Sequence, residues 1–183
     1  MGMPRALIAA LALLAALPAA AQERAGGPYI GATFGQAQWR PGCADAASCD
    51  DTDWALRVLA GYTLTHIFAA EVGYHNLGKA TGAATIKANA WEALIVASWP
   101  ATAAVSLYGK LGAYRGNAEG SGAALGARET NYGGTWGFGA QFELTRSLAL
   151  RGEWQSYVSL AGGTLGQRSD VNVLSAGALW RFR

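Results

Sequence analysis

Charged side chains are scarce in this sequence. The 183 residues include 14 Lys and Arg and 12 Asp and Glu, so charged residues make up 14%, where a soluble domain averages about 25%. The formal net charge of +2 creates no field that would attract nucleic acid or an acidic substrate. Hydrophobic residues reach 51%, with 25 glycines and 7 tryptophans. This balance is unusual for a soluble α/β enzyme and suits strands that meet lipid on one face.

Long apolar runs are also scarce, and the single one lies at the start. Arg5 precedes it, Ala6 to Leu17 is uninterrupted, Pro18 ends it, and Ala19-Ala20-Ala21 forms a small-residue cleavage site before Gln22. The run is shorter than the roughly 20 residues that a spanning helix needs. We therefore expect residues 1–21 to be a cleaved signal peptide and residues 22–183 to be one exported domain.

After Ala21 the sequence alternates between apolar and small or polar residues, which is the signal of β-strands. The alternating runs are Tyr29 to Trp39, Trp54 to Leu64, Ile67 to Asn76, Lys87 to Trp99, Val105 to Arg115, Tyr132 to Leu144, Leu148 to Val158 and Asp170 to Phe182. At about 10 to 13 residues and a tilt near 40°, each run can cross the apolar band of about 25 Å of an outer membrane. A closed barrel is the one structure besides helices that satisfies the backbone in lipid. We predict an all-β fold, an eight-stranded antiparallel up-and-down transmembrane β-barrel.

The connections between these runs alternate in length. The short ones are Thr65-His66, Pro100 to Ala104 and Thr145 to Ser147, and the longer ones are Arg40 to Asp53, Leu77 to Ile86, Gly116 to Asn131 and Ala161 to Ser169. The alternation predicts short periplasmic turns and longer outer loops.

Eight charged residues of the strands fall on the face opposite the apolar one. They are Arg57, Glu71, Glu92, Lys110, Glu143, Arg151, Glu153 and Arg181. A charge on the lipid face at mid-depth costs about 2 to 4 kcal/mol, so this segregation favours an apolar face toward lipid. Because side chains fill the interior of an eight-stranded barrel, we expect a paired network in the lumen, with no catalytic residue. In the alternative, a soluble β-sandwich, the apolar face would be the core and the charges would meet solvent.

Two cysteines, Cys43 and Cys49, stand in the first long connection. In an exported protein this spacing predicts a disulfide that closes a small loop. The alternatives are two free thiols or half of a metal site, which would need further His or Cys ligands nearby. We expect no metal ion and no cofactor.

Several segments resemble the small OmpA-like outer-membrane β-barrel family. They are Tyr29-Ile30-Gly31-Ala32, Ala60-Gly61-Tyr62, Glu71-Val72-Gly73-Tyr74 with Leu77-Gly78, Leu107-Tyr108-Gly109-Lys110-Leu111-Gly112 and Leu179-Trp180-Arg181-Phe182. The resemblance covers residues 27 to 182. It implies an eight-stranded barrel with interior ion pairs, in which Glu71, Lys110, Glu143 and Arg151 occupy network positions. It also implies that Trp180 and Phe182 form the signal to the barrel-assembly machinery.

These observations predict a non-enzymatic protein of the Gram-negative outer membrane that contributes to envelope structure. Its expected partners are outer-membrane lipid, lipopolysaccharide and the assembly machinery, and it is expected to be a monomer that binds no nucleic acid. Two alternatives stay open: a membrane-embedded lipid A-type hydrolase and a surface adhesin acting through its loops. A hydrolase needs a nucleophile next to a base, whereas the two histidines, His66 and His75, have no serine among their immediate sequence neighbours.

Overall fold

The computed structural model describes residues 26–40, 51–81, 84–122, 128–163 and 166–182. The predicted signal peptide, residues 1–21, and the predicted disulfide between Cys43 and Cys49 lie outside these ranges. Both stay predictions.

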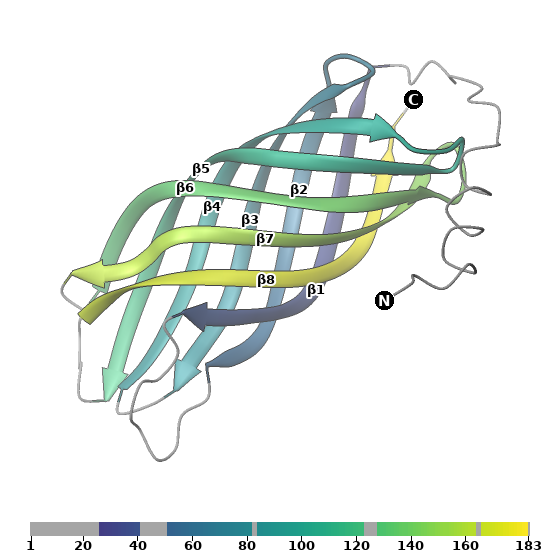
Figure 1. The fold of residues 1–183 in the computed structure, drawn as a ribbon. Coiled ribbons are helices and arrows are strands. Elements are labelled where there is room, and N and C mark those ends of the chain that lie inside the picture. The colour runs from purple at the N-terminus through teal and green to yellow at the C-terminus, as the bar shows by residue number, and fades with distance from the viewer. Residues whose placement is uncertain (1–25, 41–50, 82–83, 123–127, 164–165, 183) are drawn as a thin grey trace, which may run out of the picture.

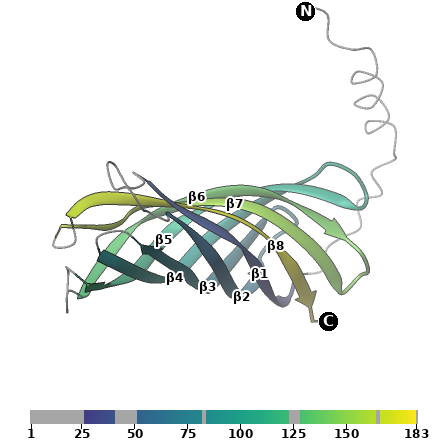
Figure 2. The ribbon, with the colours of Figure 1, turned by 90° about the horizontal axis from the view of Figure 1, so that it is seen from below.

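The described residues form a single closed barrel (Figure 1). Its strands are β1 (Pro28–Arg40), β2 (Thr52–Thr63), β3 (Phe68–Thr81), β4 (Ala84–Pro100), β5 (Val105–Gly122), β6 (Arg128–Glu143), β7 (Leu148–Gly163) and β8 (Gly166–Arg181). Each strand pairs antiparallel with the next, and β8 closes the sheet on β1. A second view, turned by 90°, shows the same strands running at a slant around the interior (Figure 2). The predicted eight-stranded up-and-down barrel is confirmed. Nowhere in the described part does a helix have the length and apolarity needed to cross a bilayer.

The two ends of the barrel differ in how the strands are joined. At one end, which we call the turn end, the connections 64–67, 101–104 and 144–147 are built alike. In each, the hydroxyl of the second residue, Thr65, Thr102 or Thr145, accepts a hydrogen bond from the amide three residues later at 2.9 to 3.0 Å. This repeated local bond defines a tight turn. The opposite end, where β1–β2, β3–β4, β5–β6 and β7–β8 connect, is called the loop end.

The strands run further toward the loop end than the sequence pattern predicts. Most of the segments expected to be loops at 77–86, 116–131 and 161–169 belongs to strands, and β5 reaches 18 residues. Gly-, Ser- and Thr-rich composition favours turns, but these segments keep their ladder hydrogen bonds. Gly78, with φ of 71°, forms a bulge in β3 and lets the pairing continue to Thr81. The expected strand boundaries at this end were therefore wrong.

The faces of the barrel are the reverse of those of a soluble protein. Large apolar side chains point outward and are exposed, among them Trp99 (70%), Leu111 (66%) and Leu174 (67%), whereas Arg57 is fully buried. Such continuous apolar exposure is incompatible with water. On the outward side of β4, aromatic Trp91 and Trp99 bracket a run of apolar residues, as interfacial girdles do. The soluble sandwich is thereby excluded.

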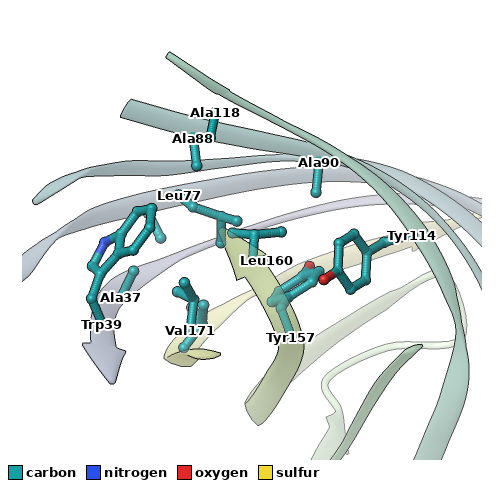
Figure 3. Packing of buried hydrophobic residues seen from close by; sticks show 12 residues of the cluster. Ala37, Trp39, Leu77, Ala88, Ala90, Tyr114, Ala118, Tyr157, Leu160 and Val171 are labelled. Atoms are coloured by element: carbon teal, nitrogen blue, oxygen red, sulfur yellow. The ribbon is translucent and has the colours of Figure 1, made fainter. Parts of the chain in front are cut away.

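An apolar cluster fills the interior toward the loop end (Figure 3). Its side chains come from seven of the eight strands and point toward one another: Ala37, Trp39, Ala55, Leu77, Ala88, Ala90, Tyr114, Ala118, Tyr157, Leu160, Val171 and Val173. Burial of this surface stabilises the strand extensions, at about 25 cal/mol per Å² of apolar area. The interior therefore has a charged middle and an apolar cap.

A charge introduced at mid-depth on the outward face should destabilise the barrel. Leu111 pairs with Ile95 and Trp136 in the middle of the apolar band, so Leu111→Arg should cost about 2–4 kcal/mol of unfolding free energy. The control Leu64→Arg, at the turn end, should cost about 0–1 kcal/mol. Denaturant titration in phospholipid vesicles measures both values. Equal costs would contradict the lipid-facing assignment.

Candidate functional site in the barrel interior

Six charged side chains meet in the middle of the lumen. Three are basic and three acidic, so the group is formally neutral: Arg57 on β2, Glu71 on β3, Glu92 on β4, Lys110 on β5, and Arg151 and Glu153 on β7. All six are buried. Successive side chains of a strand point to opposite faces of the sheet, and each of these six stands at a position whose side chain points inward.

Arg57 lies at the centre of this network and contacts all three carboxylates. Its Nη2 donates to Glu71 Oε2 at 3.0 Å, its Nη1 donates to Glu153 Oε1 at 3.3 Å, and its Nε donates to Glu92. The side chains of Arg57, Glu71 and Glu92 are fully buried. Three separate N–H groups of one planar guanidinium thus tie β2 to β3, β4 and β7, which a lysine, with one nitrogen, would do less rigidly.

The other two cations complete the charge balance. Arg151 Nη1 donates to Glu71 Oε1 at 2.6 Å, and its guanidinium carbon lies 4.6 Å from the ring centre of Tyr108. Lys110 Nζ lies 2.9 Å from Glu153 Oε2 and donates to Gln155 Oε1 at 2.6 Å. Every cation therefore faces a carboxylate, as burial of charge requires.

Neutral polar side chains add further hydrogen bonds to the three carboxylates. Tyr29 donates to Glu71 Oε1 at 2.8 Å and Tyr108 donates to Glu153 Oε2 at 2.9 Å. Tyr157 and Gln155 both donate to Glu92 Oε2, at 2.5 and 2.7 Å. Each of the three carboxylates therefore accepts bonds from a tyrosine and from at least one basic residue or amide. A network satisfied in this way is rigid, and the loss of one member leaves its neighbours unpaired.

Glycines on the inward face make room for these large side chains. A Cβ at Gly61 would lie 2.3 Å from Tyr29 Cζ, and one at Gly139 would lie 2.5 Å from Tyr108 Oη. Since Gly61 lies directly between Tyr29 on β1 and Glu71 on β3 in the strand register, the glycine lets the phenol reach across to the carboxylate. The high glycine content thus serves the packing of the lumen.

The last two predicted network residues form a separate pair near the turn end. Arg181 of β8 makes a two-pronged ion pair with Glu143 of β6, with one bond at 2.8 Å, and the side chains are 23% and 17% exposed. A cavity of about 1000 Å³ opens at this end and is lined by Tyr29, Gln141 and Arg151 as well as by this pair. The lumen is therefore wet at the turn end and blocked further in by Arg57 and its partners.

In the part of the chain that the structure describes, no three His, Cys, Asp or Glu side chains are arranged to hold a metal ion. His75 Nδ1 lies 2.7 Å from Tyr157 Oη inside the barrel, and the strand continues past it to Thr81. The expected strand, which ended at Asn76, was too short, for the reason given above for the strand boundaries.

The sequence did not reveal which neutral residues belong to the network. Its hydrogen-bonding members are Tyr29, Tyr108, Thr135, Gln141, Gln155 and Tyr157. All have the inward phase, and this is the signal that could have found them. The sequence does not show the shear of the barrel, which is the stagger between neighbouring strands. The shear determines how deep in the lumen each inward residue lies.

Comparison with known proteins gives a match over nearly the whole chain. The profile of the family described as outer membrane protein beta-barrel domain matches residues 7–182. Outer membrane protein A of Klebsiella pneumoniae is 28% identical over 135 residues, which cover 67% of this chain and 39% of that protein. The chain thus spans about two fifths of the length of this relative.

Solved structures share the fold. Neisserial surface protein A superposes with a TM-score of 0.66 at 15% identity, covering 85% of this chain and 97% of that one. Ail, the attachment invasion locus protein of Yersinia pestis, crystallised with the heparin analogue sucrose octasulfate, has a TM-score of 0.56 at 18% identity, covering 86% and 99%. At these identities the likeness shows a common barrel architecture.

Removal of the central guanidinium should destabilise the barrel strongly. Arg57→Met leaves three buried carboxylates without their common partner, so we expect a loss of about 3–5 kcal/mol of unfolding free energy. The matched control Arg181→Met breaks the partly exposed pair and should cost about 0–1 kcal/mol. Urea titration of both variants in vesicles, followed by the shift of the folded band on unheated gels, measures the difference. Similar costs for the two would show that the network does not stabilise the fold.

Proposed function

The chain belongs to the outer membrane protein beta-barrel domain family, and on this premise we propose that it is a non-enzymatic, closed barrel that contributes to the structure of the envelope. Its location is the outer membrane. Because short turns face the periplasm in this class of protein, the turn end is the periplasmic end and the loop end is the outer surface.

The observation that carries this proposal is the filled lumen. Arg57 and its three carboxylate partners span the interior from β2 to β3, β4 and β7. Beyond them, toward the outer surface, the apolar cluster closes the interior again. A hydrated ion would have to break a buried ion-pair network and then cross an apolar layer, and eight-stranded barrels of this kind leave no aqueous channel. The cavity at the periplasmic end ends at this barrier.

The arrangement of the histidines supports a non-enzymatic role. Within the described residues, the hydrogen-bond partner of His75 is Tyr157, and both side chains are at most 1% exposed. A lipid hydrolase needs a base beside a nucleophile that its substrate can reach. His75 faces the lumen, on the side of the sheet opposite the lipid. His66 lies in an exposed turn at the periplasmic end.

The partners that we propose follow from the two surfaces of the sheet. The apolar outward face is covered by outer-membrane lipid and lipopolysaccharide, and a barrel with no free edge is complete as a monomer. Trp180 and Phe182 lie on the outward face at the end of β8, where both are about half exposed. They form the closing aromatic signal to the assembly machinery, and Phe182 N completes the closure by donating to Pro28 O at 3.0 Å.

The long outer hairpins favour a second function in addition, contact with molecules at the cell surface. β4 and β5 have 17 and 18 residues, more than the roughly 9–11 that cross a membrane. Their outer ends therefore extend beyond the membrane as paired strands, and loops on a rigid scaffold are common binding elements. A structural neighbour, Ail, is an attachment invasion locus protein.

The closed-lumen proposal predicts the absence of conductance. The purified protein, inserted into planar bilayers in concentrated potassium chloride, should give no sustained current steps, while a porin in the same bilayers gives them. Reproducible ohmic steps from the folded protein would overturn the proposal that the lumen is closed.

The envelope role predicts a permeability phenotype. Cells that lack the protein should take up more of a hydrophobic fluorescent dye, and expression of the wild type should restore the barrier. The variant His75→Gln should restore it equally, because no catalytic base is involved. Failure of this variant to complement, although it folds into the outer membrane, would favour an enzymatic role.

A further inference from the structure

The outward face of β3 to β6 carries three rows of side chains, stacked toward the outer surface. Strand register defines the first row as Tyr74, Trp91, Arg115 and Tyr132, one from each strand. Tyr74 and Trp91 have ring centres 5.1 Å apart, and the Arg115 guanidinium carbon lies 6.0 Å from the Tyr132 ring centre. Interfacial aromatics mark the edge of the apolar band, so this row, which we call the outer aromatic row, marks the outer edge.

The second row is made of amides and a hydroxyl. Asn76, Asn89, Asn117 and Thr130 face one another in register. Thr130 Oγ1 donates to Asn117 Oδ1 at 2.9 Å and Asn117 Nδ2 donates to Asn89 Oδ1 at 3.4 Å. These bonds leave further donors and acceptors of the row directed outward, at the height where the headgroups of lipids begin.

The third row is basic. Lys79 lies directly opposite Lys87, and Lys87 lies opposite Glu119 on β5. Both lysines are exposed. The row is four residues beyond Trp91 along β4, which is about 13 Å along the strand or about 10 Å along the membrane normal at a tilt near 40°. Headgroup regions extend about 5–8 Å beyond the hydrocarbon on each side, so the row lies at their outer edge.

The lysine pair is unfavourable by itself. Like charges directly opposite one another on adjacent strands destabilise a sheet, with Cβ atoms about 4.5–5.5 Å apart. Among the described side chains of the rows, one carboxylate, Glu119, stands beside the cations Arg115, Lys79 and Lys87. The described side chains of these rows therefore carry 3 − 1 = +2 charges. The carboxylate of Asp53 on β2 also lies near, because it accepts a hydrogen bond from the Lys79 amide at 2.9 Å. An anion placed between the two ammonium groups would remove the repulsion.

We propose that this face, named the β3–β6 outer patch, binds a phosphorylated glycolipid of the outer leaflet. The acyl chains cover the apolar strands below the outer aromatic row. One phosphate bridges Lys79 and Lys87. Arg115, which packs on Tyr132 nearer the membrane, binds the other phosphate. The amide row, which lies between Arg115 and the two lysines, hydrogen-bonds the sugar hydroxyls of the glycolipid. The proposal rests on the outer-membrane location and is independent of whether the lumen conducts.

The test compares lipids that differ in one chemical feature. The detergent-purified barrel is incubated with diphosphorylated lipid A, with the same lipid after enzymatic dephosphorylation, and with phosphatidylglycerol, and native mass spectrometry measures the fraction of barrel that retains lipid. The wild type should retain the diphosphorylated form at least fivefold more than either other lipid. Equal retention of the dephosphorylated form would overturn the phosphate assignment, and equal retention of phosphatidylglycerol would overturn the glycolipid assignment.

Variants localise the binding to this face. K79Q/K87Q/R115Q should lose the preference for the diphosphorylated lipid, while K79R/K87R should keep it because the charges remain. The matched control Arg146→Gln removes an exposed cation from a periplasmic turn and should leave retention unchanged. Heat-shifted migration on gels verifies that each variant is folded before it is scored. A folded triple variant with wild-type retention, or an equal loss in Arg146→Gln, would contradict the proposal.

Discussion

The burial of opposite charges in the middle of a narrow lumen is the constraint on which the rest of this barrel depends. A guanidinium can leave water only where carboxylates replace its hydration. Arg57 finds three of them, from β3, β4 and β7. The contacts with β4 and β7 reach across the interior between strands that are not neighbours in the sheet, so they fix the cross-section of the barrel as well as its charge balance. The outward face is then free to be apolar at membrane depth, as lipid requires.

Two layers close the interior, each at a different depth. The ion-pair network lies where the outside of the barrel meets hydrocarbon, and the apolar cluster around Leu77, Leu160 and Val171 lies toward the outer ends of the strands. Burying apolar side chains stabilises a protein where those side chains would otherwise meet water. At membrane depth the surroundings of the barrel are already apolar, so apolar burial gains less there. Placing the apolar layer toward the exposed end and the charged layer at membrane depth therefore uses each interaction where it stabilises most.

The sequence was sufficient for the architecture because alternation with period two assigns each residue to a face. Arg57 and Val58 are adjacent, yet one is buried in the lumen and the other is 49% exposed toward lipid, as the pattern predicts. The pairings inside the lumen were not readable. Arg57 and Glu153 are 96 residues apart, and their meeting depends on shear, which moves each strand along its neighbour. The outer ends of the strands were missed because glycine-rich segments suggested loops, while inward Leu77 and Leu160 pack there.

A double-mutant cycle between Arg57 and Glu71 tests most directly whether buried ion pairs hold the barrel together. Arg57→Met, Glu71→Gln and the double variant would be compared by denaturant titration in phospholipid vesicles. The account predicts that the double variant is more stable than the sum of the single losses implies, with a coupling of about 2 kcal/mol or more, as expected for members of one network. A coupling near zero would show that the two residues act independently, and that the lumen is filled by packing without a cooperative network.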